Sequence, residues 1–180
     1  MNKSRKIHEY SITIFQKAWG EQMTRTVADD PQEQRVINDI QTYGWHCVHI
    51  AAEDELPPFS FTVGLFHSFK QPELIIFGLR QEVAHRIFCI AVDAMKAGTP
   101  IDFSKPTEQF AEAYPSVFVE VPKTDYEEHV GFCLWYYEWE DFPLYQIVWP
   151  SRDHRMPWDP EASDSFRAMQ PVLGDAPEHT

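Results

Sequence analysis

The chain has 180 residues, of which 43% are hydrophobic and 14% aromatic, and its formal net charge is −13. This length and composition predict one folded domain with a well-filled core and exclude general disorder. The negative charge disfavours binding to nucleic acid or to an anionic membrane. Because the sequence shows neither an apolar signal segment nor a run that could span a bilayer, we expect a cytoplasmic protein.

The N-terminal part of the chain has little periodicity. His8–Phe15 alternates loosely, as an edge strand or an arm on a partner would. We therefore divide the chain into an N-terminal arm of residues 1–29, an α+β domain of residues 30–174 and a short tail of residues 175–180.

A first helix is predicted to begin at Asp30, which can cap it, with Pro31 at its first position. Gly44 is suited to end it. Three strands are then predicted, over Trp45–Ala52, Phe59–Leu65 and Leu74–Leu79. The third is apolar on both faces, which is typical of a central strand, and its short connection to the second predicts antiparallel pairing.

The second half of the chain continues to mix helices and strands. Gln81–Ala97 predicts a helix with Val83, Ile87, Ile90 and Ala94 on its inner face. A capping box of Thr124 and Glu127 predicts another helix over residues 125–137, and strands are expected at 117–121 and 144–149. This order predicts a single α+β domain with a mixed, mainly antiparallel sheet packed by about three helices.

The pattern of cysteines and histidines predicts no metal site and no cofactor. Cys47, Cys89 and Cys133 are widely spaced, which argues against both a disulfide framework and a Cys-x-x-Cys site. His46 and His49 are three residues apart on a strand, so they point to opposite faces and cannot share one ion.

Polar residues follow two of the predicted strands. His67 follows the second strand, and Glu73 opens the third. An imidazole near neutral pKa can serve as acid or base, although a surface histidine and a solvated glutamate explain the same residues. These two residues are the first part of a candidate ligand site.

The second part follows the last strand. Asp153, Arg155 and Trp158 lie just beyond it. Arginine can grip an anion and tryptophan can stack on a planar ligand, but a salt-bridged turn pinned by a buried tryptophan is the alternative. We expect the two loops to lie together, so that His67 and Arg155 border one depression.

Several motifs together resemble the DUF4262 family, a domain of unknown function. They are Gly44-Trp45, Thr62-Val63-Gly64-Leu65, Pro72-Glu73-Leu74, Gly78-Leu79, Gln146-Ile147-Val148-Trp149-Pro150, Pro157-Trp158 and Gln170-Pro171-Val172-Leu173-Gly174. The resemblance covers roughly residues 43–174 and implies a fold but no agreed activity and no catalytic residues. Members typically carry Asp-x-x-Gly-Arg before Pro-Trp, whereas this chain has Asp153-His154-Arg155.

Two classes of function remain open. In the first, the protein binds or regulates a protein partner by contact, for example by neutralising a toxin. The acidic charge and the lack of a catalytic signature favour this class. In the second, it is an enzyme or ligand-binding domain for a small molecule, with a pocket of His67, Glu73, Asp153, Arg155 and Trp158 at strand ends.

Overall fold

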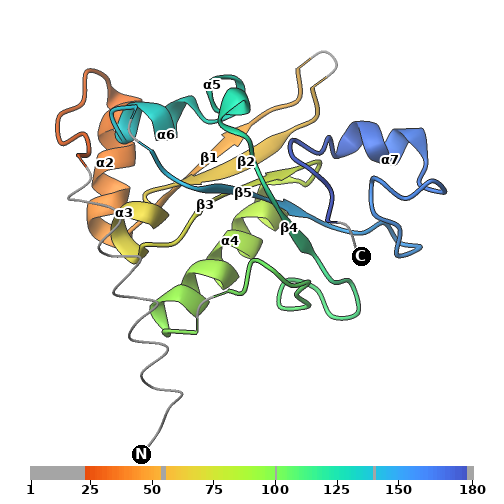
Figure 1. The fold of residues 1–180 in the computed structure, drawn as a ribbon. Helices are drawn as coiled ribbons and strands as arrows, with labels where there is room; N and C mark the ends of the chain where they lie inside the picture. The colour runs from red at the N-terminus through yellow and green to blue at the C-terminus, as the bar shows by residue number, and fades with distance from the viewer. Residues whose placement is uncertain (1–22, 54–55, 100, 140, 178–180) are drawn as a thin grey trace, which may run out of the picture.

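The computed structural model describes residues 23–53, 56–99, 101–139 and 141–177 (Figure 1). Within them, five strands form one sheet in the order β1-β2-β3-β5-β4, with helices on both faces. β3 and β5 are parallel, and the other neighbours are antiparallel. The predicted α+β domain with a mixed, mainly antiparallel sheet is thereby confirmed. The edge strand considered for His8–Phe15 lies outside the described residues.

The elements have the following bounds. The strands are β1 (His46–Ile50), β2 (Phe59–Val63), β3 (Glu73–Phe77), β4 (Val117–Glu120) and β5 (Leu144–Val148). The helices are α2 (Pro31–Tyr43), α3 (Leu65–Phe69), α4 (Gln81–Lys96), α5 (Tyr126–His129), α6 (Gly131–Tyr136) and α7 (Asp164–Met169), with a 3-10 turn at Lys123–Asp125. α3 and α7 were not predicted.

The ends of α2 follow from local chemistry. The Asp30 side chain accepts hydrogen bonds from the backbone N–H groups of Gln32 and Glu33 at 2.7 and 2.9 Å. At the other end, Gly44 has a φ of 88° and donates its N–H to the Ile40 carbonyl. Both are the interactions that unpaired groups at helix ends require, so the predicted boundaries are confirmed.

β2 ends earlier than its alternation predicts. Gly64 has a φ of 104°, which turns the chain out of the strand and into α3. Leu65 was expected at the end of this strand, but it lies on α3 and packs with Leu74, on the face of the sheet opposite to Phe59 and Phe61. His67, expected in a loop, lies on α3.

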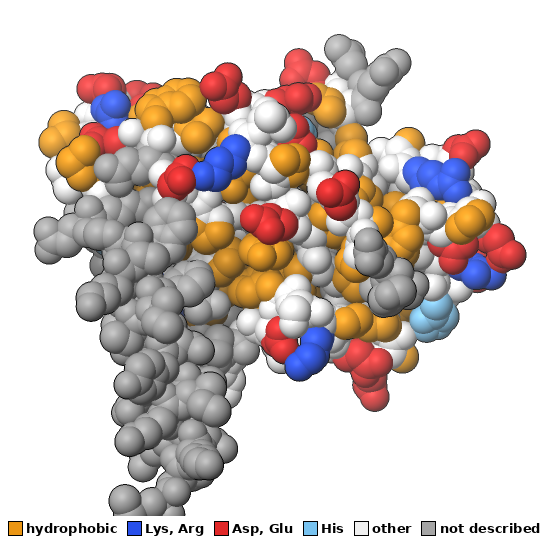
Figure 2. All heavy atoms as spheres, in the orientation of Figure 1, with side chains coloured by type: hydrophobic (Ala, Val, Ile, Leu, Met, Phe, Trp, Pro, Cys, Tyr) orange, Lys and Arg blue, Asp and Glu red, His pale blue; other side chains and the backbone are white. Residues whose placement is uncertain are grey.

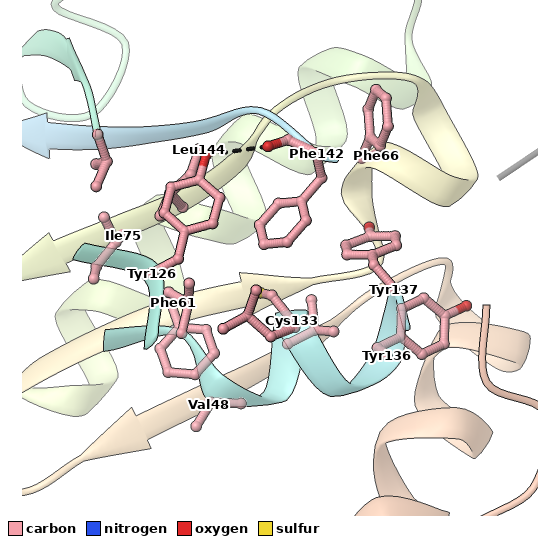
Figure 3. Packing of buried hydrophobic residues seen from close by; sticks show 14 of the residues in the cluster. Val48, Phe61, Phe66, Ile75, Tyr126, Cys133, Tyr136, Tyr137, Phe142 and Leu144 are labelled. Carbon is pink, nitrogen blue, oxygen red and sulfur yellow. Dashed lines mark hydrogen bonds between the residues drawn. The ribbon is translucent and has the colours of Figure 1, made fainter. Parts of the chain in front are cut away.

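Two apolar layers enclose the sheet. On one face, α2, α5 and α6 cover β2 and β3. Figure 3 shows Tyr126 and Cys133 beside the strand residue Phe61. On the other face, α4 covers the sheet. The strand residues are therefore divided between two apolar clusters, with Phe61 and Ile75 in one and Leu74 and Ile76 in the other.

α4 is rotated relative to its predicted inner face. Val83 is 38% exposed, whereas Ala84 is 1% exposed and Phe88 is fully buried. Ile87 belongs to both stripes of apolar residues and is buried in either case. The stripe that packs on the sheet starts at Ala84.

The helix predicted over residues 125–137 is broken. Val130 has a φ of −128° and a ψ of 45°, outside the helical range, so α5 ends there and α6 starts. The expected capping box does not form, because the Thr124 hydroxyl donates to the carboxylate of Asp125.

Candidate functional site

Glu73 is fully buried and bound on both carboxylate oxygens. One oxygen accepts the backbone N–H groups of Gly64 and Phe66 at 2.9 and 3.1 Å, together with the Tyr137 hydroxyl. The other accepts the Thr62 hydroxyl at 2.6 Å. These donors come from the end of β2, the start of α3 and the end of α6, so Glu73 ties three elements to the start of β3.

This environment suits a structural group better than a catalytic one. Burial raises the pKa of Glu73 above its ordinary value of 4.5, although the hydrogen bonds from Thr62 and Tyr137 oppose the shift. A reacting group must reach its substrate, and Glu73 has no exposed surface.

His67 is exposed and lies edge-on to Tyr136, with 6.0 Å between ring centroids. Partial desolvation of the imidazole, followed by the charge of Lys70, lowers the pKa of His67.

In the loop after β5, Arg155 forms ion pairs with two acidic residues. Its guanidinium binds Asp159 at 3.2 Å and also binds Glu161. Asp153 is exposed and is not the partner of Arg155. His154 has a φ of 59°, the backbone conformation that favours glycine, and its ring stacks on Tyr114 with centroids 4.7 Å apart. The structure therefore contains a salt-bridged turn, with a histidine in a glycine-like conformation.

The two predicted halves of the site lie at opposite ends of the sheet. β3 and β5 are parallel, and Glu73 is paired with Leu144 where both strands begin. Arg155 follows the far end of β5. Five strand residues span about 16 Å at roughly 3.3 Å per residue. The structure therefore does not bring His67 and Glu73 together with Asp153, Arg155 and Trp158.

Two glutamines clasp the C-terminal segment onto β5. The Gln146 side chain donates to the Pro171 carbonyl at 2.7 Å and accepts the Leu173 N–H at 2.9 Å. The Gln170 side chain accepts the Trp149 N–H and donates to the Trp149 carbonyl, both at 2.9 Å. The two glutamine-containing motifs therefore bind each other through backbone and side-chain hydrogen bonds.

The clasped segment forms one wall of a groove of 760 Å³. The lining residues come from the end of β4, the turn after it, the start of β5 and the C-terminal segment. They are Glu120, Val121, Pro122, Lys123, Tyr126, Phe142, Pro143, Leu173, Gly174 and Asp175. A Cβ atom on Gly174 would lie 2.1 Å from the Glu120 carbonyl oxygen, so only glycine allows the wall to approach β4 this closely.

The groove has an apolar floor and an acidic rim. Tyr126 is buried and lines the groove. Its hydroxyl donates to the Phe142 carbonyl at 3.1 Å, so its polar end is satisfied (Figure 3). At the rim, Lys123 is paired with Asp141. Glu120 and Asp175 are exposed and have no cationic partner at ion-pair distance among the described residues.

A smaller depression of 400 Å³ lies at the other end of β5. It contains one of the predicted site residues, the half-buried Trp158, together with His154 and Asp159. Prolines supply much of the remaining lining, at positions 106, 115, 150 and 160.

Three metal-ligating side chains converge between β1 and α4. The ligand atoms of Cys47, His49 and His85 all lie within 4.8 Å of one another. The spacing of cysteines and histidines did not indicate this convergence, because the sequence does not show that α4 places His85 over β1. His46 points to the other face of β1, where its Nδ1 lies 2.7 Å from a carboxylate oxygen of Asp39.

None of the helices in the described part of the chain is long and apolar enough to cross a membrane. A family model described as "Domain of unknown function (DUF4262)" matches residues 39–163. No curated protein and no solved structure matches the chain.

Proposed function

We propose that this chain, which belongs to the DUF4262 family, is a cytoplasmic binding protein that takes a basic, apolar segment of a partner protein into the groove beside β4. The observation that carries the proposal is the groove itself, which has a volume of 760 Å³ and an apolar floor. Acidic side chains without cationic partners among the described residues border it. Such a surface complements lysine or arginine residues interspersed with apolar ones.

The charge of the whole molecule supports a cationic partner. With a net charge of −13, the protein attracts basic segments and repels acidic ones before contact. Figure 2 shows hydrophobic side chains gathered in the middle of the face that carries β4, with acidic side chains around and between them. A partner segment with both basic and apolar residues would be attracted by the acidic charges and would bury its apolar residues on the same surface.

The surroundings of the candidate ligand-site residues favour binding over catalysis. Glu73 is enclosed by hydrogen-bond donors, and Arg155 is held by two carboxylates. The groove contains Tyr126, whose pKa is raised by burial and further by Cys133 and Glu120, so its hydroxyl stays protonated at neutral pH. The lining residues bind by shape and charge, and neutralisation of a toxin-like partner is one use of such contact.

A fluorescently labelled peptide of alternating lysine and leucine residues tests the proposal directly. We expect saturable one-to-one binding by fluorescence anisotropy, weakened by salt. The double variant Glu120→Gln/Asp175→Asn should weaken binding about 2- to 30-fold, since two exposed ion pairs contribute about 0.2–1 kcal/mol each. Glu112→Gln, an exposed glutamate outside the groove, is the matched control and should bind as wild type.

The same peptide with glutamate in place of lysine should not bind. Equal binding of the basic and acidic peptides, or no effect of the double variant at low salt, would contradict the proposed groove. In both cases, circular dichroism should confirm that the variants are folded.

A second candidate function rests on the depression at Trp158. Its indole and the stacked pair of His154 and Tyr114 offer flat surfaces to a planar apolar molecule. In this alternative the protein binds a small ligand there, and Trp158→Ala should abolish binding while leaving peptide binding in the groove unchanged.

A further inference from the structure

The cluster of Cys47, His49 and His85 is assembled by two elements. Cys47 and His49 are two residues apart on β1, so both side chains point to the face covered by α4. His85 reaches them from α4, where it is exposed. The Cys47 sulfur lies 3.4 Å from Nε2 of His49.

These separations match those between ligands of one tetrahedral ion. Zinc binds sulfur at about 2.3 Å and imidazole nitrogen at about 2.0–2.1 Å, which places the two ligand atoms about 3.6 Å apart at a tetrahedral angle. The observed 3.4 Å between sulfur and nitrogen is close to this value. Small side-chain rotations would bring the third ligand atom from within 4.8 Å to the same separation.

Neighbouring residues orient both histidines. Nδ1 of His49 lies 2.7 Å from the Ser60 hydroxyl, which leaves Nε2 facing the sulfur of Cys47. Ser60 is paired directly with His49 across β1 and β2. The ring of His85 stacks on Trp45 with centroids 5.6 Å apart and 23° between the planes. Hydrogen bonding of the second ring nitrogen is typical of histidines that ligate metals.

We propose that Cys47, His49 and His85 bind a thiophilic divalent cation of the zinc class. One sulfur and two imidazole nitrogens are ligands that Zn²⁺ prefers, whereas Mg²⁺ and Ca²⁺ prefer oxygen. Three protein ligands leave a fourth tetrahedral position for water or another ligand. The exposure of His85 gives an ion a path to the site. β1 and β4 are opposite edges of the sheet, so this site is separate from the groove.

Cobalt(II) is a suitable probe, because a cobalt–thiolate bond gives a charge-transfer absorption in the near ultraviolet. The full chain without a histidine tag, kept reduced, would be titrated with Co²⁺ and then with Zn²⁺. We expect the band to saturate at one equivalent of Co²⁺ and to disappear when Zn²⁺ displaces it.

Variants assign the ligands. Cys47→Ser should abolish the charge-transfer band, and His49→Ala and His85→Ala should each weaken affinity at least about 10-fold, which is the effect of losing even an outer-shell partner. Ser60→Ala keeps all three ligands and should weaken affinity by about 10-fold or more. His46→Ala, on the same strand but the other face, is the control and should bind as wild type.

Because His85 is exposed, its variant tests the site without disturbing the core. The proposal is overturned if the wild-type chain gives no cobalt–thiolate band, or if Cys47→Ser and His85→Ala bind Co²⁺ as tightly as wild type.

Discussion

At the scale of single residues, Glu73 is a fully buried polar group that joins several elements of the fold. It accepts four hydrogen bonds from groups that belong to β2, α3 and α6. Thr62 extends the network, because its hydroxyl oxygen also accepts the Leu74 N–H at 2.9 Å. Removing the carboxylate would leave buried donors without partners, which is costly in a protein interior.

Two substitutions separate the shape of Glu73 from its charge. Glu73→Ala should lower the free energy of unfolding by at least about 3 kcal/mol, since it leaves both a cavity and unpaired donors. Glu73→Gln keeps the shape and most of the hydrogen bonds, so it should cost less than about 2 kcal/mol. Urea unfolding of the three proteins measures both values.

The pH dependence of stability follows from the raised pKa of Glu73. The folded state holds the proton more tightly than the unfolded state, so this contribution is fully present below about pH 4.5 and is lost as the pH rises through the raised pKa. Wild type should therefore lose stability relative to Glu73→Gln as the pH rises from 4.5 towards neutrality. A constant difference between the two over this range would mean that the pKa is not raised.

At the scale of elements, the sequence predicts what is local and misses what depends on packing. The ends of α2 were predictable because Asp30 and Gly44 act on their own helix. The inner face of α4 was not, since the stripes that start at Val83 and Ala84 share Ile87 and both are apolar. Contact with the sheet decides between them, and periodicity contains no information about that contact.

Two truncations test the orientation of α4. Ile76 on β3 is 1% exposed and packs on the α4 side of the sheet, so Ile76→Ala should cost about 2–5 kcal/mol. Val83 is 38% exposed, so Val83→Ala should change stability by no more than about 0.5 kcal/mol. Comparable losses for both variants in urea unfolding would place Val83 in the core and contradict this orientation.

At the scale of the whole molecule, strand direction decides which predicted site residues can meet. Polar residues follow two strands, and the expectation that their loops converge required the strand ends to share one edge of the sheet. In the structure, the residues around His67 lie where β3 and β5 begin, and Arg155 lies beyond the end of β5. The sequence indicated the antiparallel pairing of β2 and β3, but it did not show that β5 lies parallel to β3. It therefore could not show whether the two halves of the predicted site meet.

The groove is also a product of the whole chain. Its floor combines the turn after β4 with the start of β5, and its wall is the C-terminal segment held by Gln146. The sequence did contain a signal for the wall, in the two motifs that begin with Gln146 and Gln170. It contained none for the floor, because Tyr126 and Phe142 come together only when the sheet forms.

The footprint of the lysine–leucine peptide on the ¹⁵N-labelled protein tests the proposed groove most directly. We expect two-dimensional NMR to show the largest chemical-shift changes at the amides of Glu120, Val121, Lys123, Leu173 and Gly174, which line the groove. Changes centred on His154 and Trp158, or no localised changes at saturating peptide, would contradict the account.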